Sequence, residues 1–219
     1  MKVKLVSYSM PTESFKREGI SDAQELIAYC ARVSNPSNQI NSETSSKLIK
    51  YLIKNAHWSP LEMVSACLEI ETTRDIARQI LRHKSFSFQE FSQRYANPVE
   101  DLDFVIREAR MQDKKNRQNS IEVLNPKLKD EWEEKQREVI EVSKKAYVWA
   151  IDKGIAKEQA RSVLPEGNTI SRLYMNGTIR SWIHYIQLRS ENGTQKEHAE
   201  IAYACSEVIN NIFPIGSEI

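Results

Sequence analysis

The chain has 219 residues, a length that suits one domain with a sizeable buried core. Its 31 basic and 30 acidic side chains nearly cancel, which argues against a protein whose main partner is bulk nucleic acid or an anionic membrane. No apolar run approaches the length of a membrane span, so we expect one soluble, intracellular domain over residues 1–219, located in the cytoplasm.

The N-terminal part of the chain is predicted to contain a strand followed by helices. Val3 and Leu5 alternate with lysines, which is typical of a strand. A helix is predicted to begin at Ser21-Asp22, and a second covers residues 48–56. Ser59–Glu62 has the pattern of a further helix start, with a serine cap, a proline at the first position and a glutamate that closes a capping box.

The next part is predicted to be a strand that leads into a helix. Residues 66–72 alternate between apolar and polar side chains, as in a half-buried strand. Thr73 is predicted to cap the helix that follows. That helix delivers Arg82 and His83 at its C-terminal end, where the helix dipole favours cations.

The middle of the chain is predicted to hold a loop and a long helix. Residues 111–120 are polar and largely charged, which indicates a flexible loop. Apolar residues from Trp132 to Ile151 mark a long amphipathic helix that stops at Gly154. A short helix then carries Arg161 and ends before Pro165.

The C-terminal part is predicted to contain one strand and two helices. Residues 170–175 read as a strand, and Asn176-Gly177 as a tight turn. A helix covers Trp182–Leu188, and the last helix is predicted to begin at Thr194, with Glu197 completing its capping box. Helices combined with strands that are not adjacent in sequence indicate an α+β fold.

The three cysteines do not suggest a disulfide or a metal site. Cys30, Cys67 and Cys205 lie far apart in apolar surroundings, as reduced thiols of a cytosol-like compartment do. No histidine or cysteine has ligand spacing, so we predict no bound metal.

The segment Arg82–Tyr95 holds the densest chemistry, with cations and hydroxyls interleaved with aromatic rings. Arg82 and Arg94 each present a planar fork of donors that suits a phosphate or a pyrimidine edge. His83 titrates near neutrality and so can donate to an anion or exchange a proton. Two other readings are open: a surface turn with solvated charges, and a basic aromatic surface for single-stranded nucleic acid.

Two further segments carry candidate binding residues. His57–Glu62 includes a predicted helix N-terminus, which accepts phosphate or the polar edge of a flavin, although a capped helix with nothing bound fits equally well. Arg180, His184 and Gln187 share one face of a predicted helix that ends at Arg189. A ligand-facing surface is favoured there over a histidine that only packs.

These segments resemble one known family. Arg82-His83-Lys84 followed after seven residues by Ser92 is similar to the Arg-His-Arg motif of the flavin-dependent thymidylate synthases. The segments 57–62, 89–95, 159–165 and 180–189 also resemble this family. There are two departures. Lys84 stands where the family usually has arginine, and Thr178 occupies the place, two residues before Arg180, that asparagine fills in many members.

The resemblance implies a fold and an activity. The fold would be a single α+β domain with a mixed or antiparallel sheet, flanking helices and a long helical excursion. The reaction would be the methylation of dUMP to dTMP, with carbon from 5,10-methylenetetrahydrofolate and electrons from NADPH through bound FAD. The family uses no cysteine nucleophile, and its members are homotetramers whose active sites draw residues from several subunits.

The resemblance also implies roles for individual residues. Arg189 would be catalytic, stabilising the pyrimidine as N3 loses its proton, which is electrostatic catalysis. Residues matching the dUMP contacts of the family are Gln79, Arg82, Glu90, Phe91, Ser92, Gln93, Arg94, Arg161 and Arg189. Residues matching its FAD contacts are His57, Ser59, Arg82, His83, Lys84, Glu90, Thr178, Arg180 and His184.

Two other functions stay open on the sequence. One is the single-stranded nucleic-acid-binding module. The other is a catalytically inactive relative that still binds flavin, with Lys84 as the first damaged position.

Overall fold

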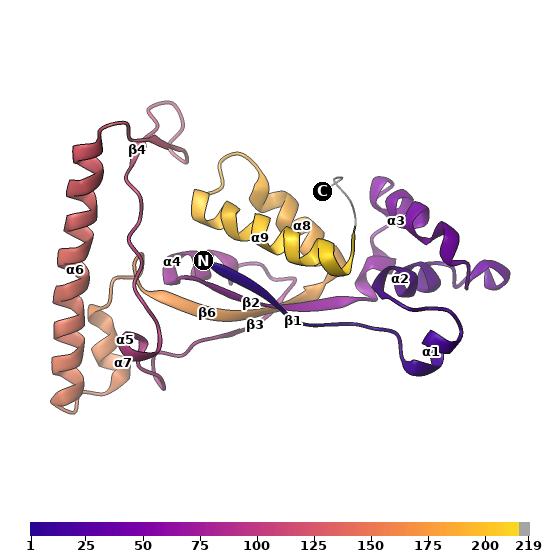
Figure 1. The fold of residues 1–219 in the computed structure, drawn as a ribbon, viewed down its shortest axis with the longest axis horizontal. Coiled ribbons are helices and arrows are strands. Elements are labelled where there is room, and N and C mark those ends of the chain that lie inside the picture. The colour runs from indigo at the N-terminus through magenta and orange to yellow at the C-terminus, as the bar shows by residue number, and fades with distance from the viewer. Residues whose placement is uncertain (215–219) are drawn as a thin grey trace.

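A four-stranded sheet forms the centre of the protein. The structure is a computed structural model and describes residues 1–214. The strands are β1 (Lys2–Tyr8), β2 (Ser65–Thr73), β6 (Ile170–Thr178) and β3 (Ser87–Glu90). They lie in the order β1-β2-β6-β3, and every neighbouring pair is antiparallel (Figure 1).

Three helices cover one face of this sheet: α4 (Arg74–Ile80), α8 (Ile179–Ser190) and α9 (Lys196–Ile212) (Figure 1). The strands alternate, so that Leu68 of β2 and Met175 of β6 are fully buried against the helices. The indole Nε1 of Trp182 donates to the carbonyl of Ala66 at 3.0 Å, which fixes α8 on β2. Burial of an aromatic side chain with its N–H satisfied makes this contact strongly stabilising.

The opposite face of the sheet is polar. Glu71 of β2 lies between Lys2 of β1, at 3.7 Å, and Arg172 of β6, at 2.9 Å. Glu69 likewise lies between Lys4, at 3.6 Å, and the Tyr174 hydroxyl, which donates at 2.9 Å. An antiparallel sheet with one buried and one polar face has this alternation of side chains.

Short helices between β1 and β2 gather at one end of the sheet (Figure 1). The predicted helix start at residues 21–22 is confirmed, because the Asp22 carboxylate accepts from the Glu25 backbone N–H at 2.8 Å. The helices of this group are α1 (Glu13–Arg17), α2 (Ala23–Ala31), η1 (Pro36–Asn38), η2 (Ser42–Thr44), α3 (Ser45–Lys54) and η3 (Ser59–Glu62).

The long helix α6 (Pro126–Asp152) stands beside the other end of the sheet (Figure 1). Asn125 caps its start, a cap that was not predicted. Gly154, with φ of 78°, follows its end, as predicted. Tyr147 and Leu164 belong to a second, small core that α6 forms with short segments. Those segments are α5 (Pro98–Asp101), α7 (Lys157–Ala160) and η4 (Arg161–Val163).

The predicted fold class is confirmed, but three local predictions are wrong. Asn176-Gly177 is not a turn, because β6 continues through both residues to Thr178. Gly177 is needed there for close packing. A Cβ at this position would lie 2.4 Å from Cδ1 of Phe86, a distance that forces the ring to move.

The two predicted capping boxes do not form. Ser59–Glu62 is a single 3₁₀ turn without a serine cap, and the Glu62 carboxylate accepts from Arg180 instead. The last helix begins at Lys196 rather than Thr194, and the Glu197 carboxylate faces two arginines. In both cases an ion pair with a distant arginine takes the carboxylate that the local pattern assigns to the backbone.

The predicted loop at residues 111–120 is found over residues 113–119, where it connects the two strands of a short hairpin. β4 (Arg110–Gln112) pairs with β5 (Ser120–Glu122) in a separate two-stranded sheet. The Asp113 carboxylate accepts from backbone N–H groups in the connection, which gives the tip its shape. Within residues 1–214, no helix is both long and apolar enough to cross a membrane.

Candidate active site

The predicted site residues fall into three groups in the structure. The first group, called the α4–α8 cluster, lies where α4 and α8 end, next to the first turn of α9. It consists of Gln79, His83, Arg189 and His198, of which His198 was not predicted.

Arg189 is held in the α4–α8 cluster by His83. Its guanidinium Nε donates to His83 Nε2 at 3.0 Å, so the histidine accepts through a neutral ring nitrogen. Burial and then the charges of Arg189 and Arg82 lower the pKa of His83 to about 4. At neutral pH the ring therefore stays uncharged. It orients the arginine by accepting a hydrogen bond and does not repel the guanidinium charge. Tyr185 packs edge-on against the ring of His83, with centroids 4.9 Å apart.

Gln79 is held in the same cluster by two side chains of the α9 region. Its Nε2 donates to Gln195 Oε1 at 2.8 Å, and its Oε1 lies 3.2 Å from His198 Nδ1. His198 is fully buried, and burial followed by the charge of Arg189 and by His83 lowers its pKa to about 3. A buried neutral histidine therefore supports the amide predicted to bind dUMP.

The second group, called the α8 start cluster, surrounds the N-terminus of α8. Arg180 pairs with Glu62, and His184 packs edge-on against Trp58 with centroids 4.5 Å apart. Burial and then the charge of Arg180 lower the pKa of His184. Other members are exposed and come from the segments before β2 and β3. They are His57, Ser59 and Lys84, together with Arg82, which lies between the two clusters because it follows α4 and adjoins His83.

The donor set of the α8 start cluster suits an anionic flavin nucleotide. Arg82 and Lys84 are exposed, and neither forms an ion pair within residues 1–214. The Ser181 hydroxyl donates to the carbonyl of Ser85 at 3.2 Å, which ties the basic segment to the first turn of α8. Unpaired cations beside a helix N-terminus form an anion-binding site, because the helix dipole adds to their charge.

The third group, called the β3 exit cluster, lies beyond the C-terminal end of β3. It consists of Ser92, Arg94 and Arg161. Arg94 pairs with Glu158 at 3.2 Å, and both side chains are about half exposed, at 55% and 48%. The Arg161 guanidinium donates to the carbonyl of Glu158 at 3.3 Å. Ser92 accepts from the Arg94 backbone N–H at 3.4 Å and has no base beside it.

β3 separates the β3 exit cluster from the basic segment that precedes the strand. The four residues of β3, at about 3.3 Å each, put on the order of 13 Å between the basic segment before the strand and the Ser92 turn after it. Residues predicted to bind one nucleotide therefore lie at opposite ends of an edge strand.

Four other predicted residues already have partners or positions within the fold. The Glu90 carboxylate accepts from Ser171 at 2.8 Å, and the Thr178 hydroxyl caps α8 by accepting from the Ser181 backbone N–H at 3.2 Å. Phe91 is half-buried. Gln93 is buried, and its Nε2 has no hydrogen-bond partner within residues 1–214, a vacancy that suits an acceptor on a ligand.

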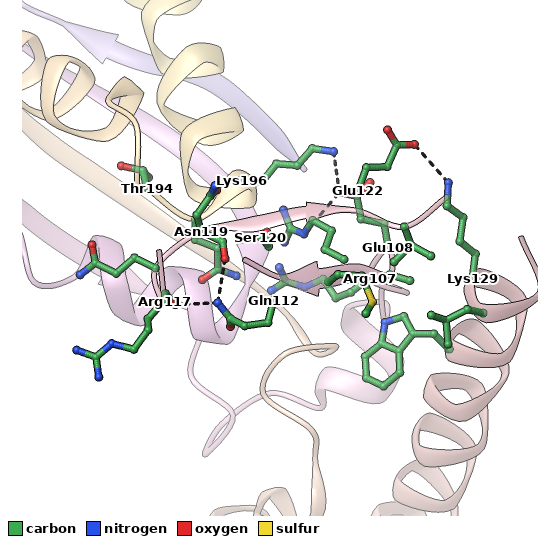
Figure 2. Close-up of a pocket in the computed structure, with 18 residues that line it drawn as sticks. Arg107, Glu108, Gln112, Arg117, Asn119, Ser120, Glu122, Lys129, Thr194 and Lys196 are labelled. Atoms are coloured by element: carbon green, nitrogen blue, oxygen red, sulfur yellow. Dashed lines mark hydrogen bonds and ion pairs between the residues drawn. The ribbon is translucent and has the colours of Figure 1, made fainter. Parts of the chain in front are cut away.

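A cavity of about 1020 Å³ lies beside the α4–α8 cluster (Figure 2). The β4–β5 hairpin, the start of α6 and the chain at Thr194–Lys196 form its walls. Ion pairs lie among its lining residues. Lys196 binds Glu108 at 2.7 Å, and Lys129 binds Glu122 at 3.4 Å. Among residues 1–214, no group of three or more metal-ligating side chains is gathered here or elsewhere.

Sequence reasoning missed the residues that connect this cavity to Gln79. The Arg107 guanidinium contacts Asp75 of α4 at 2.7 Å and Glu197 of α9 at 3.1 Å. Arg110 contacts the other oxygen of Glu197 at 2.5 Å. Arg107 and Arg110 match no motif, and nothing in their local sequence indicates a partner far along the chain.

Comparisons with known proteins agree on one family. The model of the family described as thymidylate synthase complementing protein matches residues 18–215. A probable flavin-dependent thymidylate synthase of Paramecium bursaria Chlorella virus 1 is 50% identical over 214 residues, covering 98% of this chain and 96% of that protein. A flavin-dependent thymidylate synthase of Synechocystis sp. is 49% identical with the same coverage.

A solved structure has the same fold. The crystal structure of a UMP/dUMP methylase from Streptomyces cacaoi, bound with 5-Br UMP, superposes with a TM-score of 0.81 at 25% sequence identity. The superposition covers 98% of this chain and 90% of that one. The sheet, the helices that cover it and the long α6 therefore belong to an architecture already seen in a nucleotide methylase.

Proposed function

The chain belongs to the thymidylate synthase complementing protein family, the flavin-dependent thymidylate synthases, and we propose that it methylates dUMP to dTMP with a bound flavin. The alternative of a nucleic-acid-binding module is not favoured, because the family match covers almost the whole chain and the net charge is only +1. Two relatives that are 50% and 49% identical in sequence are named as a probable flavin-dependent thymidylate synthase and a flavin-dependent thymidylate synthase.

The observation that carries the proposal is the fixed position of Arg189. Its guanidinium is half-buried and oriented by a neutral His83, beside the Gln79 amide. A cation held in a partly desolvated site stabilises negative charge that develops on a pyrimidine when N3 loses its proton. Because the cation is already in place, no reorganisation is needed when this charge appears.

The bound flavin is proposed to be FAD, held by the α8 start cluster. The group supplies hydride chemistry, while the chain supplies orientation and charge. Arg82, Lys84 and Arg180 would neutralise its phosphates, and His57, Ser59 and His184 line the same surface. Lys84 keeps the positive charge that an arginine would give but lacks the planar fork, so one bidentate contact becomes a single one. NADPH is proposed to reduce the flavin and 5,10-methylenetetrahydrofolate to donate the carbon.

The β3 exit cluster is proposed to bind the phosphate of dUMP. The rest of that active site is proposed to come from another subunit. The separation along β3 supports this, because it puts on the order of 13 Å between the basic segment before the strand and the turn that carries Ser92 and Arg94. An exposed apolar stripe on α6 supports association. Its members are spaced by three, four or seven residues and so share one face of the helix, as in helix–helix interfaces. They are Leu128, Trp132, Val139, Val142 and Trp149, exposed by 38%, 45%, 50%, 68% and 58%.

We therefore propose a homotetramer with shared active sites. Light scattering of the purified protein is expected to give the mass of four 25.4 kDa chains. A monomer that retains full activity would contradict the shared site.

The function is tested by tritium release from dUMP labelled at C5. The purified protein is expected to be yellow, to lose this colour when NADPH is added, and to release tritium only when the folate is also present. A yellow protein that never releases tritium would be an inactive flavin-binding relative. A colourless protein that binds oligonucleotides at low salt would overturn the proposal.

A further inference from the structure

A partly buried chain of hydrogen bonds leads from Glu197 to the Gln79 amide, which the proposed function places against the substrate. Gln195 Nε2 donates to Glu197 Oε2 at 3.0 Å, and Gln79 Nε2 donates to Gln195 Oε1 at 2.8 Å. The chain ends where Gln79 Oε1 lies 3.2 Å from His198 Nδ1. Only the proposed function makes Gln79 a substrate contact, so the inference below rests on that proposal.

The direction of every bond in this chain follows from one group. An ionised carboxylate can only accept, so Gln195 must turn its NH₂ toward Glu197 and its carbonyl toward Gln79. Gln79 must then turn its own NH₂ toward Gln195 and its carbonyl toward His198, which has to carry its proton on Nδ1. A primary amide alone has no such preference, because its two ends have nearly the same shape.

Glu197 is held as an anion by two arginines. Its side chain is 9% exposed, and it contacts Arg107 at 3.1 Å and Arg110 at 2.5 Å. Burial acts to raise its pKa, but the Arg110 hydrogen bond, the bond from its own backbone N–H, the charge of Arg107 and the Gln195 hydrogen bond outweigh burial and lower the pKa to about 2. The carboxylate is therefore ionised at neutral pH.

His198, at the end of this series of hydrogen bonds, is consistent with these bond directions. With the proton on Nδ1, His198 Nε2 is left with only a lone pair, and this buried atom has no partner within residues 1–214. His83 has the same tautomer for an independent reason, because its Nε2 accepts from Arg189. Both histidines of the cluster are then neutral, each with a lone pair on Nε2.

We propose that Glu197 is a positioning residue, which acts through Gln195 to fix which end of the Gln79 amide faces the pyrimidine nucleotide. One hydrogen of Gln79 Nε2 and one lone pair of Oε1 are left for substrate, each on a defined side. A rotated amide would place a donor against a donor or an acceptor against an acceptor. A mispaired contact of this kind weakens dUMP binding and leaves the chemistry at Arg189 largely intact.

The variant Glu197→Gln tests this, since a neutral amide can donate or accept. The KM for dUMP is expected to rise roughly 10- to 100-fold, as for one lost hydrogen bond to a charged or desolvated partner, with a smaller change in kcat. The matched control is Asp75→Asn. Asp75 also binds Arg107, at 2.7 Å, but lies outside the amide chain, so its loss is expected to lower stability while the KM for dUMP stays unchanged.

Gln195→Met interrupts the same series of hydrogen bonds with a side chain of similar size and no change in charge. It is expected to raise the KM in the same way, so an insoluble Glu197→Gln protein does not remove the test. Equal KM values for the wild type and a folded Gln195→Met variant would overturn the proposal, as would an equal rise in Asp75→Asn.

A spectroscopic readout separates this inference from the proposed function. The chain has four histidines, so the ¹⁵N resonances of His198 in the holoprotein can be assigned from their loss in His198→Asn. The wild type is expected to show a single Nδ1–H tautomer, and Glu197→Gln a mixture of both. A wild-type Nε2–H tautomer, or one unchanged in Glu197→Gln, would overturn the inference. A wild type that neither binds nor methylates dUMP would defeat the proposed function, and the tautomers would still report on the amide chain.

Discussion

The two ends of β3 hold their predicted ligand residues in opposite ways. Before the strand, His83 and Arg189 are half-buried and joined by a hydrogen bond of 3.0 Å. After the strand, Arg94 and Glu158 are about half exposed and form an ion pair at 3.2 Å. Exposed pairs of this kind contribute only about 0–1 kcal/mol, so a phosphate can displace the glutamate at little cost.

This difference distinguishes the cluster that a single chain already holds in place from the cluster that stays exposed until a second chain covers it. The α4–α8 cluster is preorganised by burial and by the Glu197 chain, which suits a catalytic role. The β3 exit cluster is open to solvent in a single chain, which suits a surface that a second copy covers. Loss of Arg189 from the first should therefore affect turnover, and damage to the second should affect nucleotide binding.

The largest effect is expected from Arg189→Ala. Removing a charge that stabilises the transition state lowers turnover by roughly 10²- to 10³-fold in comparable sites. Flavin should stay bound, because Arg82, Lys84 and Arg180 are untouched. Tritium release and the flavin absorbance are the measurements. The matched control, Arg78→Ala, removes an arginine that is 60% exposed and paired with Glu166, and it should leave turnover unchanged. Normal turnover in Arg189→Ala would remove this residue from the mechanism.

Arg94→Ala should change binding more than turnover. Loss of one charge-assisted contact to phosphate is expected to raise the KM for dUMP roughly 10- to 100-fold. Mixed tetramers of Arg94→Ala and Arg189→Ala chains would then contain some sites with both arginines intact, and these should regain activity. A mixture no more active than either variant alone would show that the site is not shared between chains.

Acid should weaken the preorganised cluster more than the open one. The pKa values of His83 and His198 are lowered from 6.5 to about 4 and about 3. Below pH 6.5 the unfolded chain therefore binds more protons than the folded chain. Their contribution to stability is complete above pH 6.5 and is lost as the pH falls toward 3. Glu197, lowered from 4.5 to about 2, adds a further loss between those two values.

The variant His198→Gln should flatten this dependence. Removing one such histidine is expected to reduce the slope of unfolding free energy between pH 6.5 and 3 by at most about 1.4 kcal/mol per pH unit. Urea unfolding of the holoprotein at several pH values measures the slope. Tyr185→Phe, which alters the same buried cluster without removing a histidine, is the control. An unchanged slope in His198→Gln would mean that this ring is not held neutral.

The same division explains what the sequence could predict. The strand at residues 66–72 and the helix that stops at Gly154 follow from periodicity and from a terminal glycine, which are local features. The basic segment after α4 was found because its residue types match a motif. Gly177 was misread as a turn, since its real constraint is the Phe86 ring about ninety positions away.

The carboxylate of Glu197 shows the limit most clearly. Its spacing from Thr194 fits a capping box, and the partners that override this pattern, Arg107 and Arg110, come from a distant segment. Local sequence cannot rank a backbone N–H against an arginine brought in by the fold. Gln195 and His198 were missed for the same reason, because their importance lies in whom they contact.

Lys84→Arg should have the smallest effect, and it tests whether Lys84 of the α8 start cluster contacts the flavin. Lys84 is exposed, so restoring the guanidinium of the family motif adds one bidentate contact to phosphate and alters no packing. We expect flavin to bind roughly two- to fivefold more tightly, as for a partly exposed charged contact, with unchanged kcat at saturating flavin. Fluorescence titration of the flavin-free protein measures the affinity. Lys84→Met, which keeps the chain length and removes the charge, should weaken binding. If both variants bind flavin like the wild type, Lys84 does not contact the cofactor, and the cations of this cluster reduce to Arg82 and Arg180.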